Sequence, residues 1–330
     1  MSEIYYSKAV NEALDEEMAR DDSVVLMGED IGPYGGAFGV TKGLFDKYGR
    51  DRIWETPISE NSFTGIAVGA AMLGVKPVVE IMFMDFIALA LDQLLNSAGK
   101  LHYMYGGQVT VPMVLRTPGG AKGGYGPSHS QMLSNLLVGV PGIKVVAPSN
   151  AMQVKGILKS AIRDPNPVVV IENKRLYPQR HEVPEEEYTL PLDKAEIFNI
   201  DGADAPAALS LVSYSSMTPV CLSVQQAFRN AGVNIEVVDL VSLQPIDTET
   251  LFGSVNKTGR VVIAEEACLT GGVGAEVSAL IAEHCLDSLE APIARVGAKD
   301  VPIPSSLVME KMVLPQPEDV ARAVKATLDY

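Results

Sequence analysis

The sequence SVVLMGEDIGPYGG, residues 23–36, joins an uninterrupted apolar run to a glycine-rich segment. A short apolar run that ends in glycines is typical of a buried strand followed by a tight loop. Upstream, Ser7 is placed to cap a helix. The apolar residues on one face of that helix are Val10, Ala13, Leu14 and Met18. A helix, a buried strand and a loop in this order favour an α/β protein.

Strands and helices alternate along the rest of the chain. In the first half, strands are expected at Pro77–Phe83, Val111–Thr117, Ile143–Ala147 and Pro167–Glu172, and helices at Asn61–Leu73, Asp85–Tyr105, His129–Gly139 and Asn150–Arg163. In the second half, strands are expected at Ala208–Tyr214, Ile235–Leu240, Arg260–Glu265 and Ile293–Val296, and helices at Val220–Ala231, Gly274–Cys285 and Glu318–Leu328. Nearly continuous apolar strands separated by helices predict parallel sheets covered on both faces.

The alternation is interrupted at Asn173–Leu192, which holds three prolines and the acidic run Glu185–Glu187. This composition is typical of a connection between domains. We therefore predict two doubly wound α/β domains, at residues 1–180 and 201–330, connected by residues 181–200. The length of 330 residues agrees with two domains.

Composition excludes several classes of protein. Hydrophobic residues make up 47% and charged residues 20%, as in a globular protein with a real core. The formal net charge of −15 argues against nucleic acid or an anionic membrane as the main partner. The N-terminal segment has no apolar stretch of the kind found in secretory signals, which favours the cytoplasm, or the mitochondrial matrix or a plastid if a transit peptide was removed. The three cysteines show no metal-binding spacing.

Glu60 is the first candidate catalytic residue. It follows the proline turn in Trp54–Ser59 and begins an apolar helix. A carboxylate in this position is commonly a capping group stabilised by the helix dipole. One walled in by apolar side chains has a raised pKa instead, which suits proton exchange with a ring nitrogen. The helix itself, Ile66–Leu73, is apolar on all sides, so we expect it either within the core or at a subunit interface.

Three loops carry further candidates. Thr117–Gln131 follows a strand and contains His129, an imidazole able to exchange protons near neutral pH. Thr270–Glu276 also follows a strand, but it lacks a complete dinucleotide or P-loop fingerprint, which favours a tight turn. Asp164–Pro167 follows a predicted helix, and its oxygens suit either an ordinary turn or a hard cation.

As a set, these motifs resemble the beta subunit of the 2-oxo acid dehydrogenase decarboxylase component, a transketolase-like family that includes the pyruvate, acetoin and branched-chain enzymes. The resemblance spans nearly the whole chain in order. The matching segments are Gly28–Asp30, Gly35-Gly36 with Val40–Leu44, Thr56–Glu60, Gly65–Ala71, Asp92-Gln93 with Asn96, His129–Gln131, Ala161–Asp164 with Asn166-Pro167, and Glu265-Glu266 with Gly271-Gly272.

The resemblance implies a thiamine diphosphate enzyme, with a pyrimidine-binding first domain and a second domain like the transketolase C-terminal domain. In this family the residue matching Glu60 bonds the aminopyrimidine ring, and those matching Phe86 and Met82 pack against it. The residue matching His129 is implicated in passing the acyl group to a lipoyl arm. A structural potassium ion is held by the positions matching Met113, Ala161, Ile162, Asp164 and Asn166.

The resemblance also implies a partner. Single-chain relatives and the alpha subunit carry a GDG motif that holds magnesium and the diphosphate, and no GDG occurs in this sequence. An alpha subunit must therefore supply it, in a heterotetramer of two alpha and two beta chains that docks on a dihydrolipoyl acyltransferase core. Pyruvate is the favoured substrate, with acetoin and branched-chain 2-oxo acids as alternatives. A non-catalytic docking module and a nucleotide-binding oxidoreductase are the hypotheses from other classes.

Overall fold

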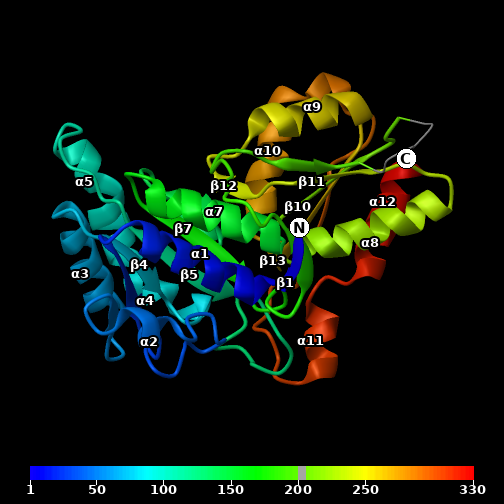
Figure 1. The fold of residues 1–330 in the computed structure, drawn as a ribbon. Coiled ribbons are helices and arrows are strands. Elements are labelled where there is room, and N and C mark those ends of the chain that lie inside the picture. Colours follow the sequence, from blue (N-terminus) through cyan, green and yellow to red (C-terminus); the bar gives the residue numbers. More distant parts are fainter. Residues whose placement is uncertain (200–205) are drawn as a thin grey trace. The chain divides into compact units, whose positions relative to one another are not determined.

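The computed structural model describes residues 1–199 and 206–330 (Figure 1). They form two compact units, one of Met1–Gly119 with Leu136–Leu192 and the other of Gly120–Asn135 with Asp193–Tyr330. The sequence-based division did not separate residues 120–135 from the first domain. They belong to the second unit because carboxylates of that unit, on Glu266 and Glu310, accept hydrogen bonds from their backbone. Residues 201–205 of the predicted second domain lie outside the described residues.

The first unit is built on a parallel sheet. Its strands, in spatial order, are β6 (Lys144–Val146), β7 (Val168–Asn173), β5 (Val114–Gly119), β4 (Lys76–Glu80), β2 (Val24–Gly28) and β3 (Ile53–Glu55). Strands β2, β5 and β7 are buried throughout, as expected from their apolar sequences. A separate antiparallel pair joins β1 (Ser2–Tyr5) to β8 (Arg180–Val183).

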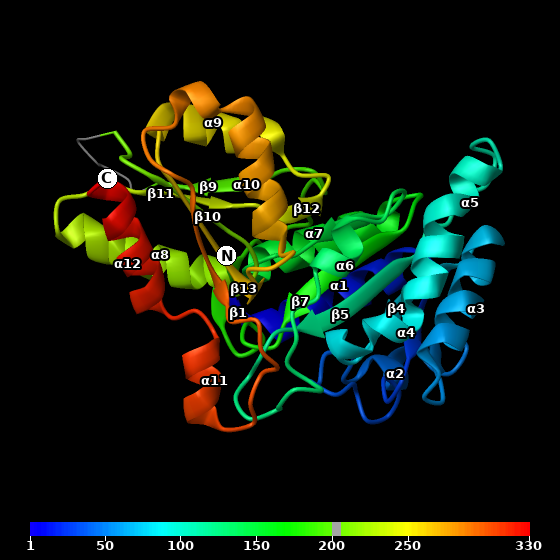
Figure 2. The same ribbon diagram turned by 180° about the vertical axis from the view of Figure 1, so that it is seen from behind.

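Helices pack against this sheet. They are α1 (Tyr6–Arg20), α2 (Leu44–Tyr48), α3 (Glu60–Met72), α4 (Ile87–Asp92), α5 (Gly99–Met104), α6 (Asn135–Val138) and α7 (Ala151–Arg163), with a 3-10 turn at Met84–Phe86 and a π-helical turn at Gln93–Ala98. Helices α1 and α7 lie side by side (Figures 1 and 2). Two buried lysines on α7 link them, because Lys155 bonds Glu12 and Lys159 bonds Glu16.

The second unit is a smaller α/β structure. Its sheet has the order β14 (Ala294–Ala298), β13 (Val261–Cys268), β10 (Ser210–Ser213), β11 (Glu236–Asp239) and β9 (Glu196–Phe198), with only β9 antiparallel to its neighbour among the described strands. The remaining elements are β12 (Ser242–Gln244), α8 (Met217–Asn230), α9 (Thr248–Thr258), α10 (Val273–His284), a 3-10 turn at Leu286–Ser288, α11 (Leu307–Val313) and α12 (Pro317–Leu328). Leu211, Val237 and Val262 on the strands form its core with residues of α8 and α12.

Two local predictions are wrong. Ser7 does not cap α1, because the helix has already begun at Tyr6 and the N-cap residue is Tyr5. The helix expected at His129–Gly139 is reduced to α6 by the loop before it. The helical stretch expected at Asp85–Tyr105 is confirmed, because helical turns run without a break from Met84 to Met104, with a π-helical turn at Gln93–Ala98. Of the two positions predicted for helix α3, burial within the core of this chain does not hold, since Ile66 is 60% exposed, and a place at a subunit interface stays a prediction. In the described parts of the chain, no helix is long and apolar enough to span a bilayer.

Candidate active site

Acidic residues gather where the parallel strands of the first unit end. Glu29 follows β2, Glu80 is the last residue of β4, and Glu172 lies near the end of β7. The carboxyl ends of parallel strands meet at one edge of a sheet, which is where α/β proteins bind ligands. All three side chains are buried, so their charges require compensation or protonation.

One arginine compensates two of these acids. Arg116, on β5, donates from Nε and Nη2 to the two oxygens of Glu172 at 2.7 and 2.8 Å, and its Nη1 bonds Glu80. The hydroxyl of Tyr177 donates to Glu172 at 2.7 Å. Burial raises the pKa of Glu80, while the charge of Arg116 counters that rise. This group is a closed ion-pair network between neighbouring strands.

Glu60 is the first residue of α3 and is 5% exposed. The residue in the N-cap position is Ser59, which makes no side-chain capping bond. In residues 1–199 and 206–330, the Glu60 carboxylate accepts no hydrogen bond. Its position therefore does not fit the capping role that composition alone favoured, and it leaves the carboxylate available to a ligand.

Glu29 forms a pair of buried carboxyls with Glu60. Burial, followed by the negative charges of Glu60 and Asp30, raises the pKa of Glu29 from 4.5 to about 7. The backbone N–H of Ser59 counters part of this shift. Glu29 Oε1 is buried and has no hydrogen-bond partner within the described chain. Between about pH 4.5 and pH 7, Glu29 is therefore largely protonated, whereas an ordinary glutamate is ionised.

Glu29 belongs to the matching segment Gly28–Asp30 but is not among the site residues predicted from the sequence. The available signal was its place directly after a buried strand, at the edge where ligands bind. The raised pKa depends on Glu60, 31 positions further along the chain. No local pattern in the sequence reveals that neighbour.

Met82 and Phe86 follow β4 in the same unit as Glu60. Both side chains are partly buried. The ring of Phe86 contacts that of Phe83 edge-on at 6.1 Å, and Phe83 contacts Phe38 at 5.5 Å. This aromatic cluster fixes the segment after β4. The packing of Met82 and Phe86 on a pyrimidine ring stays a prediction.

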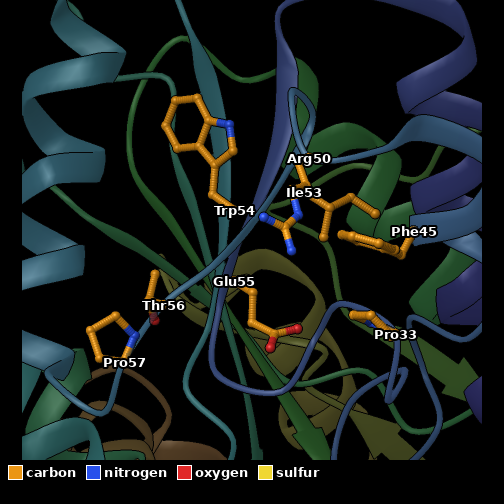
Figure 3. Close-up of a pocket in the computed structure, with 8 residues that line it drawn as sticks. All are labelled: Pro33, Phe45, Arg50, Ile53, Trp54, Glu55, Thr56 and Pro57. Carbon is orange, nitrogen blue, oxygen red and sulfur yellow. The ribbon is translucent and has the colours of Figure 1, made fainter.

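A cavity of about 480 Å³ adjoins the segment that leads to Glu60 (Figure 3). Its lining residues are Pro33, Phe45, Arg50, Ile53, Trp54, Glu55, Thr56 and Pro57. Figure 3 shows the Glu55 carboxylate between the Thr56-Pro57 turn and Pro33. Glu55 Oε2 accepts a bond of 2.9 Å from the N–H of Gly32, which ties the glycine-rich loop to the turn before α3.

His129 lies in the second unit, on a loop fixed by two carboxylates. Glu266 accepts from the N–H of Ala121 at 2.8 Å, and Glu310 accepts from Gly123 and Gly124 at 3.1 and 3.0 Å. The imidazole Nδ1 is 2.9 Å from the hydroxyl of Ser128 and the ring is partly exposed. The loop thus leaves the imidazole of His129 partly exposed.

The predicted potassium ligands gather at the turn between α7 and β7. The N–H of Asp164 bonds the carbonyl of Ala161 at 3.3 Å, and the N–H of Asn166 bonds Asp164 Oδ1 at 2.9 Å. Met113 joins this turn because its carbonyl accepts from Val168 at 3.1 Å. Ile162 lies in the last turn of α7. Lys144 Nζ is 2.5 Å from Asp164 Oδ2, so the carboxylate already has a cation beside it.

The loop at Thr270–Glu276 is a tight turn rather than a phosphate site. Glu265 Oε1 accepts a bond of 3.1 Å from the N–H of Gly274, in the first turn of α10. At Gly272 there is no room for a Cβ beside that carboxylate. A carboxylate of the chain itself therefore occupies the place that an anion takes at a helix N-terminus.

Comparisons with known proteins agree with this architecture. Residues 2–180 match the family model described as "Transketolase, pyrimidine binding domain", and residues 205–320 match "Transketolase, C-terminal domain". A solved structure titled "Split gene transketolase, inactive beta4 tetramer" shares the fold with a TM-score of 0.79, at 23% identity over 99% of this chain and 98% of that one. The fold therefore defines a transketolase-like chain of two α/β domains.

Curated relatives identify the family within the transketolase-like proteins. The pyruvate dehydrogenase E1 component subunit beta of Porphyra purpurea is 45% identical over 98% of this chain and 97% of the relative. That of Gracilaria tenuistipitata var. liui is 44% identical over 99% of both chains, and a mitochondrial subunit beta-2 of Oryza sativa subsp. japonica is 44% identical over 98% and 86%. The chain belongs to the family of beta subunits of the 2-oxo acid dehydrogenase E1 component, and its similarity favours the pyruvate branch over the alternatives.

Glu29→Gln tests the pair of carboxyls. Because the folded state raises the pKa of Glu29 from 4.5 to about 7, it favours the neutral form, and this group's contribution to the free energy of unfolding decreases as pH rises through that interval. Glutamine stays neutral and retains an acceptor for the Ser59 N–H. We expect the variant to be about 1–3 kcal/mol more stable than the native chain near pH 8, with little difference below about pH 4.5. Urea unfolding at both pH values measures this, and an equal effect at both would contradict the shift.

Proposed function

We propose that this chain is the beta subunit of a thiamine diphosphate-dependent pyruvate dehydrogenase. It would act in oxidative decarboxylation of pyruvate and in transfer of the acetyl group to a lipoyl group on an acyltransferase. The observation that carries the proposal is the buried Glu60 carboxylate, without a hydrogen-bond partner in the described chain and next to the protonatable Glu29.

The residues around Glu60 fit an aminopyrimidine ring. One turn along α3, the Thr64 Oγ1 is buried and has no hydrogen-bond partner in the described residues. Such buried polar atoms are costly unless a ligand or water satisfies them. Met82 and Phe86, both partly buried, offer apolar surface of the kind that packs on a heteroaromatic ring. When bound, thiamine diphosphate supplies a carbanion nucleophile and an electron sink for loss of carbon dioxide.

Glu60 would hold a proton at a pyrimidine ring nitrogen. Its buried position, without a hydrogen-bond partner in the described residues, leaves the carboxylate oxygens available to that nitrogen. Glu29 adds a second carboxyl whose pKa is about 7, close to neutral pH. Proton gain by one member of the pair lowers the cost of ionising the other. His129 would donate or accept a proton as the acyl group passes to the lipoyl arm.

The apolar face of α3 to α5 supports a partner subunit. Large hydrophobic side chains exposed on this part of the first unit are Ile58, Ile66, Met72, Leu73, Leu89, Tyr103, Met104 and Tyr105. An exposed apolar patch of this kind marks a protein interface. Glu60 begins the same helix, so a chain covering this face would also come close to Glu60.

We infer that an alpha subunit covers this face and supplies magnesium and the diphosphate site, giving a tetramer of two alpha and two beta chains. The second unit would contribute to docking of the acyltransferase core. The proposed compartment is the cytoplasm of a bacterium, or the mitochondrial matrix or a plastid.

Ile66→Glu tests the interface. Burying an isoleucine contributes about 1.5–3 kcal/mol, so loss of this contact should weaken association with the alpha subunit by about 10–100-fold. Titration calorimetry with purified alpha subunit measures the change. Leu286→Glu is the matched control, because Leu286 is similarly exposed but lies on the second unit. Equal weakening by both variants, or by neither, would contradict the assignment of this face.

Glu60→Gln tests the catalytic proposal. In the reconstituted complex we expect decarboxylation of pyruvate to fall by about 10²–10⁴-fold, the usual contribution of a positioned proton-transfer group. Native mass spectrometry should show an intact tetramer. Glu249→Gln, another acid in the first turn of a helix, should leave the rate unchanged. Unchanged turnover by Glu60→Gln would favour the non-catalytic docking module.

The same assay tests the substrate. The native complex is given pyruvate, acetoin and branched-chain 2-oxo acids in parallel. Pyruvate should be turned over with the highest kcat/KM. Turnover of acetoin but not pyruvate would replace the proposed activity with that of an acetoin dehydrogenase while leaving the role of Glu60 intact.

We also propose a structural potassium ion at the turn after α7, held by the backbone carbonyls of Met113, Ala161 and Ile162 with oxygens of Asp164 and Asn166. The carbonyl oxygens at the end of a helix suit a hard cation. The ammonium group of Lys144 already compensates part of the negative charge of Asp164.

Thermal unfolding in KCl and in NaCl of equal ionic strength checks the potassium proposal. An ion present at about 10–100 times its dissociation constant stabilises the folded state by about 1–3 kcal/mol. We expect the higher melting temperature in KCl, and a smaller difference in Asp164→Asn. Identical melting temperatures in the two salts would exclude a selective potassium site.

A further inference from the structure

A groove of about 670 Å³ lies in the second unit, and His129 is not among its lining residues. Three elements form it: the edge strand β14, the end of α11 and one side of α12. Its lining residues are Leu269, Arg295, Val296, Gly297, Lys299, Lys311, Met312, Val313, Leu314, Pro315, Asp319, Arg322, Ala323 and Ala326. In Figure 1, α11 and α12 follow one another in red at the C-terminal end of the chain.

The groove is positively charged in an acidic protein. Arg295, Lys299, Lys311 and Arg322 line it with a single acid, Asp319, although the whole chain carries a formal charge of −15. Asp319 pairs with Arg322 at 3.1 Å. Lys299 and Lys311 are exposed and make no ion pair with any described residue. Two lysines are therefore left without an acidic partner among the described residues.

The floor of the groove is apolar and includes the edge of a sheet. Leu314 and Val313 are buried beneath it, while Met312 is 64% exposed. Strand β14 is the last strand of its sheet and, among the described strands, pairs only with β13. Residues 294–297 of β14 are half-buried, and three of them line the groove. An edge strand offers unpaired backbone groups to another extended chain.

We propose that this groove binds an acidic segment of a partner protein, extended along β14, with apolar side chains between its acids. The lysines favour carboxylates, the floor favours aliphatic side chains, and the strand edge favours an extended backbone. A polyanion without apolar groups, such as nucleic acid, would interact only with the lysines and not with the apolar floor or the strand edge. The proposal does not depend on the role of Glu60 or on the identity of the substrate.

Fluorescence polarisation with a defined probe tests the proposal on the full chain. The probe is a labelled ten-residue peptide that alternates glutamate and valine. It is compared with the same peptide carrying lysine in place of glutamate, and with a labelled single-stranded DNA of ten nucleotides. We expect the acidic peptide to bind most tightly and to bind more weakly as salt increases, because charges contribute to the contact.

Two double variants with equal change of charge identify the site. Lys299→Glu with Lys311→Glu reverses both unpaired lysines of the groove and should weaken binding of the acidic peptide at least tenfold. Lys100→Glu with Lys325→Glu changes two exposed lysines outside the groove and should alter binding less than twofold. Hydrogen exchange should show that the bound peptide protects the amides of β14.

Several outcomes would overturn the proposal. They are equal weakening by both double variants, binding of the DNA as tight as that of the acidic peptide, protection confined to other strands, and absence of binding up to millimolar peptide. Circular dichroism of each variant verifies its fold, and because all four lysines are exposed, the variants should unfold at the same temperature as the native chain.

Discussion

The first unit depends on the ion pairs that the buried guanidinium of Arg116 forms with two carboxylates. Arg116 lies on β5, between β4 and β7, and bonds a carboxylate from each of these neighbours. Removing one partner from a buried ion pair costs about 3–5 kcal/mol, because the remaining charge stays buried without compensation. The network therefore fixes the relative positions of three strand ends. The ion-pair network thereby also positions the residues that follow β4, including Met82 and Phe86.

The same arrangement leaves a second pair of acids without this compensation. Arg116 is bonded to Glu80 and Glu172, whereas the strongest charges acting on Glu29 are those of Glu60, Asp30 and Glu80, all negative. Two buried carboxyls that repel one another bind a proton more readily than either would alone. One edge of the sheet thus contains a tightly paired group that stabilises the fold and a proton-binding group suited to chemistry. The contrast between them is set by which acids the arginine contacts.

Sequence patterns predicted the elements whose residues are determined locally. The apolar runs gave β2, β4 and β7 to within a few residues, and the turn before α3 identified Glu60. The features that these patterns did not predict depend on residues that are distant in the sequence. The raised pKa of Glu29 requires Glu60 and Asp30 in three dimensions, and the loop of His129 is fixed by Glu266, which is 145 positions from Ala121. Residues 129–134 continue this loop, and only Asn135–Val138 of the helix predicted at residues 129–139 is helical.

The composition of helix α3 carries information beyond the packing of this chain alone. Its composition indicates burial on all sides, yet the chain alone buries only one face and leaves Ile66 exposed. An apolar residue gains nothing from exposure to water, so both facts are reconciled when another chain covers the helix. The helix begins at Glu60, and a covering chain therefore approaches the carboxylate that has no partner within its own chain. We therefore propose one cause for the incomplete packing of α3 and the incomplete bonding of Glu60, which is a site that is completed at a subunit interface.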